Sequence, residues 1–346
     1  MSTQALTVYG TGLVCGVGLN AAAACAAIRA GINNFQETRF MDAGGEWIMG
    51  CEVPLAQPWR GLTKLVKMAC MAIAECMANS EIKIVPVETP VLLCVAEGER
   101  PGRLDGLDHE LFHAVQTELG MDFHEQSSLI PQGRVAGSVA LYQARKLIHD
   151  QGFKQVLIVG VDGFLNASSL MAYQERERLL TSQNSNGFIP GEAASAIIVG
   201  APIADDKPRL HCLGMGFAIE KATVDAELPL RADGLAAAIK SAEADAGCTI
   251  GSTDFRITDL SGEQYYFKEA ALALSRTLRQ RKEFYDIWHP ADCFGEVGAG
   301  IGPAILVVLL DAFKKGIAPG HRILKHTGND NGKRCALILS YQAARN

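Results

Sequence analysis

The chain has little of what a nucleic-acid-binding, secreted or membrane protein needs. Its 346 residues carry a formal net charge of −6, whereas wrapping nucleic acid needs a strong basic face. Its longest apolar run, Ile301 to Leu310, is too short to cross a bilayer. The residues after Met1 show no basic segment followed by an apolar one, so no secretory signal is predicted. We therefore expect a cytoplasmic protein with no membrane span and no nucleic-acid partner.

Cysteine is plentiful, with 10 residues, but no two of them form a Cys-x-x-Cys pair. The sequence thus lacks the spacing of a structural zinc site or of a thioredoxin-like redox motif. In a large chain without a secretory signal, scattered cysteines are typically reduced thiols that pack as small apolar residues. We expect neither a metal ion nor a cofactor.

What the chain does contain is an alternation of strand and helix patterns. Hydrophobic residues make up 48% of it, which is enough for a well-buried core. Short apolar runs alternate with segments in which apolar residues recur at helical spacing, and this predicts an α/β fold. Strands are predicted at 6–9, 90–95, 155–161, 193–199, 255–260 and 335–340, and helices at 21–29, 62–77, 136–149, 236–246 and 297–315.

A faint internal repeat divides the chain. Gly10 to Gly12, reading Gly-Thr-Gly, follows the first predicted strand, and Gly214 to Gly216 echoes it after a similar apolar run. The first copy nearly matches the dinucleotide-binding fingerprint, but the third glycine is missing, so we interpret it as a tight strand exit. The echo predicts two similar halves of one compact unit, residues 1–203 and 204–346, joined by a surface linker around 202–208.

Two glycine-rich segments carry the most specific patterns. Gly187 to Ala194 reads G-F-I-P-G-E-A-A, and Asp292 to Gly300 reads D-C-F-G-E-V-G-A-G. They resemble the G-F-x-x-G-E-G-A and G-H-x-x-G-A-A-G-A segments of β-ketoacyl-(acyl carrier protein) synthases. On this resemblance the chain is identified as a divergent member of the thiolase-like superfamily. The resemblance implies the five-layered thiolase fold, α/β with two similar halves, mixed sheets and buried helices, usually assembled as a homodimer.

These segments are interpreted as structural loops. Glycine permits backbone conformations that are closed to other residues, so its spacing marks constrained turns. Glu192 is interpreted as a loop-stabilising carboxylate, because isolated carboxylates are mostly structural. The predicted loop residues are Gly187, Phe188, Gly191, Glu192, Gly262, Gly295 and Gly298.

The resemblance also implies a reaction centre, which this chain lacks. The family uses a cysteine nucleophile at a helix N-terminus and two histidines. Val135 occupies the position of the cysteine, counted back from Gly152, while Ser261 and Asp292 occupy the positions of the histidines. Valine cannot form a thioester, so these three positions are predicted to be degenerate, and no catalytic residue is assigned.

Two interpretations of the neighbouring polar residues stay open. A rebuilt centre would combine Cys293, His289 and Glu263, as in an acyl-thioester transferase, a hydrolase or an altered 3-oxoacyl-(acyl carrier protein) synthase. Alternatively, Asp259, Glu263 and Asp292 form a polar network that holds the old active-site loops. We favour the network.

The function that the resemblance favours is that of a non-condensing scaffold or partner protein. The segments at 259–263 and 292–299 are also similar to a sub-branch that lacks the catalytic residues and is often encoded with type VI secretion effectors and adaptors. A secretion effector or adaptor is therefore the expected protein partner, besides a second copy of the chain. The alternative is a module that binds an acyl group or an acyl carrier protein without turnover.

Overall fold

A continuous sheet of ten strands dominates the computed structural model, which describes residues 4–343. Its order is β10-β9-β11-β12-β8-β1-β7-β6-β4-β5. The first half of the chain contains β1 (Leu6–Cys15), α1 (Ala21–Arg29), β2 (Gln36–Met41), β3 (Trp47–Gly50), α2 (Gly61–Ala78), η1 (Pro86–Glu88), β4 (Val91–Val95), α3 (Leu111–Leu119), β5 (Ser128–Pro131), η2 (Gly133–Val135), α4 (Ala136–His149), β6 (Gln155–Gly163), α5 (Ala167–Glu175) and β7 (Glu192–Gly200).

The second half begins after the loop at 201–207. It contains β8 (Pro208–Ile219), α6 (Asp233–Ala246), η3 (Ile250–Ser252), β9 (Phe255–Thr258), α7 (Gln264–Thr277), β10 (Ile287–Trp288), α8 (Ala291–Phe294), η4 (Gly298–Gly300), α9 (Ile301–Lys314), β11 (Arg322–Gly328) and β12 (Lys333–Ala343).

The two halves of the sheet repeat one another about its centre. Reading outward, the first half runs β1, β7, β6, β4, β5, and the second runs β8, β12, β11, β9, β10. In both halves the two inner junctions are antiparallel and the two outer ones are parallel. The expected architecture of two similar halves with mixed sheets is confirmed. The innermost strands, β1 and β8, pair with each other at the centre.

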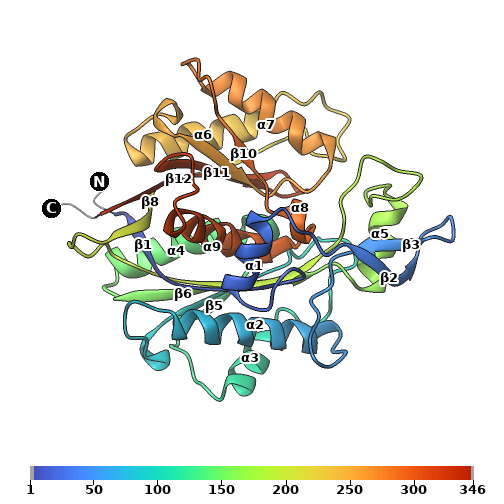
Figure 1. Ribbon diagram of the computed structural model, residues 1–346, viewed down its shortest axis with the longest axis horizontal. Coiled ribbons are helices and arrows are strands. Elements are labelled where there is room, and N and C mark those ends of the chain that lie inside the picture. The colour runs from blue at the N-terminus through green and yellow to red at the C-terminus, as the bar shows by residue number, and fades with distance from the viewer. Residues whose placement is uncertain (1–3, 344–346) are drawn as a thin grey trace.

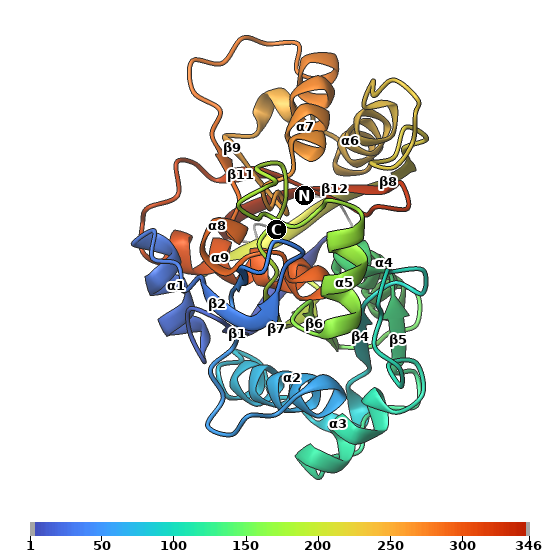
Figure 2. The ribbon, with the colours of Figure 1, turned by 90° about the vertical axis from the view of Figure 1, so that its right-hand side faces the viewer.

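Helices and strands stack in five layers (Figure 1). Helices α2 and α3 cover one outer face, α6 and α7 cover the other, and α4 and α9 lie in the middle layer (Figure 2). Nearly all of α9 is buried, because its sequence is apolar on every side and both faces of the helix meet the sheet. Across residues 4–343, the length and apolar character of every helix fall short of what crossing a membrane requires.

The repeated glycines have a role that differs from the predicted one. Gly12 lies inside β1, which runs on to Cys15, so the prediction of a tight strand exit at 10–12 was wrong. A Cβ built on Gly12 would lie 2.1 Å from the carbonyl oxygen of Ala72 in α2. At Gly216 in β8, a Cβ would lie 2.0 Å from the carbonyl oxygen of Ala238 in α6. Each half therefore uses its glycines to let an outer helix approach the backbone of its central strand.

The helix predicted at 297–315 begins later than expected. Gly298 has a φ of +51°, a left-handed conformation that glycine adopts without strain. The chain turns through η4 there, and α9 starts at Ile301. This delay sets the entry angle of the buried helix and places the preceding segment next to the site described below.

Candidate functional site

Val135 is the N-cap residue of α4 in the middle layer. Its side chain is buried and gives the helix no capping hydrogen bond. The preceding turn, η2, starts at Gly133, whose φ is +54°. A Cβ on Gly133 would lie 2.1 Å from Oε2 of Glu97. Both the positive φ and the lack of space for a side chain therefore require glycine at this position. The helix N-terminus where the resemblance places a thiol thus carries an inert aliphatic side chain.

Arg134 places a buried guanidinium next to Val135. Its Nη2 donates to Oη of Tyr266 at 2.6 Å and to Oδ1 of Asp330 at 2.7 Å. Its Nη1 donates to Oε2 of Glu296 at 3.4 Å. The guanidinium carbon also lies 4.4 Å from the centre of the Tyr266 ring, which is a cation–π contact. One arginine therefore ties η2 to α7, to the segment before α9 and to the loop between β11 and β12.

A second buried arginine, Arg178, extends this network. It forms a two-pronged ion pair with Glu263, in which Nη2 donates to Oε2 at 2.8 Å and Nε donates to Oε1. Its Nη1 also donates to Oδ2 of Asp330 at 3.0 Å. Asp330 thus accepts from Arg134, Arg178 and Tyr266 at once. Charged hydrogen bonds of this kind are the strong ones, and here water is largely excluded from them.

The third arginine of the network, Arg100, is only partly satisfied. Its Nη1 donates to Oδ2 of Asp162 at 2.6 Å, and the same oxygen accepts from the backbone N–H of Ala299 at 3.0 Å. Its Nε and Nη2 are buried without a hydrogen-bond partner. The cavity enclosed by these side chains measures about 10 Å³, which is room for a single water molecule. The space is filled by side chains and has no volume for an acyl chain.

The ionisation of the network follows from its burial and its arginines. Burial raises the pKa of Glu296 to about 7, although Arg134 and the bond donated by Ser261 oppose this shift. Burial opposes the ionisation of Asp330 as well, but Arg134 and Arg178 outweigh it and hold the pKa of that carboxyl well below its usual range. The charge of Glu296 therefore changes near neutral pH, whereas Asp330 stays ionised.

The imidazole of His326 is neutral at physiological pH. His326, on β11, sits 3.4 Å from Oγ1 of Thr258 and is buried. Burial lowers the pKa of His326 to about 3, and the nearby arginines and lysine lower it further. No cysteine lies among the residues of the network or lines its cavity in the described part of the chain. The thiol–imidazole pair of a condensing centre is thus not assembled here.

The residues predicted from the sequence fall into two groups. Ser261 donates to Oε2 of Glu296 at 2.8 Å, and Glu263 pairs with Arg178, so both belong to the network. Asp259 belongs to it too, since its Oδ2 lies 3.8 Å from Nε of Arg134 and also accepts from the backbone N–H of Gly328 at 3.0 Å.

Asp292 lies outside the network. Its side chain is 67% exposed, and Oδ2 lies 2.9 Å from Nδ1 of His289. The prediction that Asp292 shares a network with Asp259 and Glu263 was wrong, because α8 turns residue 292 toward solvent. Glu296, four residues on, meets Arg134 instead.

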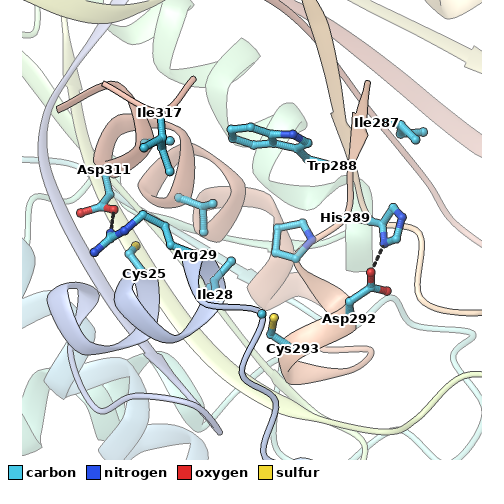
Figure 3. A pocket seen from close by; sticks show the side chains of 14 residues that line it. Cys25, Ile28, Arg29, Ile287, Trp288, His289, Asp292, Cys293, Asp311 and Ile317 are labelled. Atoms are coloured by element: carbon cyan, nitrogen blue, oxygen red, sulfur yellow. Dashed lines mark hydrogen bonds and ion pairs between the residues drawn. The ribbon is translucent and has the colours of Figure 1, made fainter. Parts of the chain in front are cut away.

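Cys293 and His289 line a separate cleft, together with Asp292 (Figure 3). Glu263 is buried against Arg178, so the predicted trio of Cys293, His289 and Glu263 is not brought together. Burial raises the pKa of the Cys293 thiol, and the charge of Asp292 raises it further. The pKa of His289 is raised as well, chiefly by its bond to Asp292. The thiol is therefore protonated and the imidazole is engaged with a carboxylate.

The glycine-rich loops pack against one another beside the network. A Cβ on Gly191 would lie 2.1 Å from the carbonyl oxygen of Phe294, and one on Gly187 would lie 2.4 Å from the backbone of Leu179. Glu192 accepts from Nζ of Lys64 at 2.6 Å and from the backbone N–H of Val53 at 3.1 Å. These contacts fit the predicted role of this glutamate as a loop-stabilising carboxylate.

Sequence reasoning missed the arginines that build the network. Arg134 stands directly before Val135, and Asp330 stands in the loop between β11 and β12. The available signal was charge within otherwise apolar or glycine-rich segments, since arginine is rarely buried without a partner. That signal identifies a buried charge but not its partner, which here lies 196 residues away along the chain.

Comparison by sequence finds no matching family model and no matching curated protein. Comparison by structure finds many similar chains. A chain in the complex of a type II PKS acyl-carrier protein with its ketosynthase bound to the hexaketide has a TM-score of 0.78 and 15% identity. The match covers 97% of this chain and 98% of that one.

Two further solved structures make the same point. A chain in the complex of a ketosynthase with its chain length factor from Xenorhabdus doucetiae matches with a TM-score of 0.70 and 12% identity, over 98% of each chain. A β-ketoacyl synthase from Burkholderia phymatum matches with a TM-score of 0.72 and 14% identity, over 97% of this chain and 99% of that one. The protein therefore has the five-layered thiolase fold of the ketosynthases.

Proposed function

We propose that the protein is a non-condensing, ketosynthase-like partner protein. One observation carries this proposal: the helix N-terminus that would hold the nucleophile begins at Val135, and the space around it is filled by Arg134 and its partners. A cavity of about 10 Å³ cannot admit an acyl group. The fold is kept, while the nucleophile, its bases and the substrate space are not.

The thiols of the chain support the same conclusion. Burial raises the pKa of Cys15, Cys25 and Cys51 to about 12, and it raises the pKa of Cys293 as well. Because the thiolate is the nucleophilic form of cysteine, these groups are poor acyl acceptors at neutral pH.

The test of this proposal is acylation. The protein is incubated with acetyl- and malonyl-loaded acyl carrier protein, beside an active ketosynthase as positive control, and its intact mass is measured. We expect an acyl adduct on the control and none on this protein. A stable adduct on this protein, above all on Cys293, would overturn the proposal.

The proposed assembly is a homodimer, as the family resemblance implies. The structural neighbours include a ketosynthase in complex with a chain length factor, so this fold supports pairing of related subunits. In this chain β5 ends the sheet and leaves one edge without a strand partner in the described residues. Exposed apolar side chains on α4 and β8 offer further contact area, since Tyr142 is 41% exposed and packs edge-on against Phe217 at 5.8 Å.

Light scattering coupled to gel filtration tests the homodimer. We expect a mass of twice 37.0 kDa for the wild-type protein and a shift toward 37.0 kDa for Tyr142→Glu. Met171→Glu is the matched control, because Met171 is also an exposed apolar helix residue, at 62%, but lies on α5. A monomeric wild-type protein, or equal effects of both variants, would rule out this interface.

The proposed heterologous partner is a type VI secretion effector or its adaptor, with an acyl carrier protein as the alternative. Its support is the sequence resemblance at 259–263 and 292–299. Co-purification of the tagged protein with each purified candidate distinguishes them. Capture of the carrier protein alone would favour the module that binds a carrier without turnover.

A rebuilt acyl-transfer centre is the second candidate function. One observation favours it, namely that His289, Asp292 and Cys293 line the same cleft. A thiol-reactive acyl probe separates the two functions, because a rebuilt centre requires labelling of Cys293 that is lost in His289→Gln. The partner protein that we propose shows no such dependence on His289.

A further inference from the structure

A cleft of about 480 Å³ lies between α1, β10, α8 and α9, apart from the arginine network (Figure 3). Its volume is within the range of small-molecule sites in proteins. The side chains that line it come from both halves of the chain. They are mostly apolar and include Ile28, Ile287, Trp288, Pro290, Val308 and Ala312.

The cleft has a buried floor and an exposed rim. The floor is formed by Cys25, Val308 and Ala312, which are 1%, 7% and 2% exposed, so it is part of the permanent core. At the rim, Ile317 is 49% exposed. The indole of Trp288 lies along one wall, held by contact with the Phe255 ring at 4.7 Å between centroids. Such a cleft is preformed by packing and needs no rearrangement to admit a ligand.

Each charged group in the wall already has a partner in the wall. Arg29 pairs with Asp311 on one side of the cleft, and His289 pairs with Asp292 on the other (Figure 3). Burial raises the pKa of the Cys25 thiol to about 12, so this group is neutral as well. A charged ligand would lose hydration on entry and find no unpaired countercharge. A neutral apolar ligand loses little hydration free energy on entry, and it removes the apolar surface of the floor and the indole from water.

From this geometry we propose that the cleft binds a neutral, apolar small molecule with an aromatic or branched hydrocarbon body, stacked against Trp288. The proposal does not rest on the absence of condensing activity, since the cleft shares no residue with the arginine network. A second copy of the chain and a charged ligand are the alternative occupants.

The neutral fluorophore N-phenyl-naphthylamine is the probe for this site. We expect saturable enhancement of its fluorescence, with energy transfer from the indole, on titration into the wild-type protein. Trp288→Phe should keep the binding and lose most of the transfer. The chain has 3 tryptophans, so the part of the transfer that Trp288→Phe removes is the part that reports on this cleft. Binding that does not saturate, or transfer that is unchanged in Trp288→Phe, would overturn the assignment to this cleft.

Substitutions at the rim and floor locate the probe. Ile317→Asp places a charge at the rim, and Ala312→Leu fills the floor, so each should weaken binding by about tenfold or more. Ile219→Asp is the matched control, because Ile219 is an isoleucine of β8 that is 61% exposed and remote from the lining. Circular dichroism establishes that each variant is folded. Unchanged affinity in folded Ile317→Asp would contradict the proposal.

Two further measurements distinguish the occupants. The anionic probe anilinonaphthalene sulfonate should bind more weakly than the neutral probe, and equal affinity would refute the argument from paired charges. The neutral probe should bind a constant fraction of sites as protein concentration rises. Loss of sites with increasing concentration would mean that a second copy covers the cleft, which would also refute the proposal.

Discussion

Arg134, which is buried, and Asp330, which is partly buried, form an ion pair, 2.7 Å between Nη2 and Oδ1, that joins the two halves of the fold beside the N-terminus of α4. Arg134 belongs to the turn before the middle-layer helix, and Asp330 to the loop between β11 and β12. The pair therefore acts as a brace between these two segments.

Removing the charge of Asp330 should destabilise the protein strongly. Asp330→Asn keeps the size of the side chain but leaves Arg134 and Arg178 short of a counter-ion in a buried site. Breaking such a pair typically costs on the order of 3–5 kcal/mol. Urea denaturation of the variant and the wild-type protein measures this difference in the free energy of unfolding.

The control for this loss is an ion pair at the surface. Arg276 and Asp233 lie 2.6 Å apart with side chains that are 44% and 61% exposed. Arg276→Gln should cost less than about 1 kcal/mol, because solvent screens an exposed pair. Equal losses in the two variants would show that the brace is no stronger than a surface contact.

Titration of Glu296 should make stability fall as pH rises. The pKa of its carboxyl is about 7 in the folded protein and 4.5 as its ordinary value. The folded state thus binds more protons than the unfolded chain between these values. This difference in proton binding stabilises the folded state in full below pH 4.5. The stabilisation amounts to about 3 kcal/mol and is lost as pH rises through 7.

Glu296→Gln isolates this effect. Glutamine retains oxygen to accept from Ser261 and Arg134 but does not titrate. The free energy of unfolding, measured by urea at intervals between pH 5 and 8, should fall less steeply in the variant than in the wild-type protein. Parallel pH profiles would show that Glu296 ionises normally in the folded state.

Gly298 should tolerate no side chain. A Cβ there would lie 2.1 Å from Oδ2 of Asp162, inside the pair that Asp162 makes with Arg100. Gly298→Ala should therefore lose on the order of 1–3 kcal/mol from crowding, besides the strain of a positive φ. Gly316→Ala is the control, because Gly316 has a φ of +68° and nothing within 4 Å of the added atom. Equal shifts of the unfolding temperature in the two variants would mean that the positive φ alone, and not crowding by Asp162, costs stability.

Cys293→Ser should be nearly silent. The residue is buried at the edge of the cleft, and Cys51 contacts its backbone oxygen, which the substitution retains. We expect a loss of no more than about 1 kcal/mol from the buried hydroxyl. The measurement pairs thermal unfolding with the biological activity of the system encoded around the gene. A folded variant that lacks this activity would show that the thiol takes part in a reaction, which contradicts the proposed function.

Sequence periodicity predicted the fold well, because strands and helices reflect local patterns of apolar residues. The helix predicted at 136–149 has those bounds in α4, and the two similar halves are present. The resemblance, counted back from Gly152, placed Val135 at a helix start, where the structure has it. The expectation that Asp292 joins the polar network failed, because a helix of four residues, α8, leaves too short a pattern to recognise and turns the side chain outward.

The arginine network was beyond reach of the sequence for another reason. Its strongest contacts join Arg134 to Asp330 and Arg178 to Glu263, pairs that only the folded chain brings together. Gly12 and Gly216 show the same limit, since the helix carbonyl that each one admits is not adjacent in sequence. Local pattern identifies which residues are unusual, and tertiary structure determines what they meet.

The central joint of the sheet has a consequence for how the protein opens. In the described part of the chain, β1 and β8 pair through Leu6 with Cys212 and Thr7 with His211. So short a backbone ladder contributes little stability by itself. However, the core around α9 contains side chains from both halves in one cluster. Neither half can then detach without exposing that core. Amide protons in β6 and β11, the equivalent strands, should exchange in a single cooperative event with the same free energy of opening.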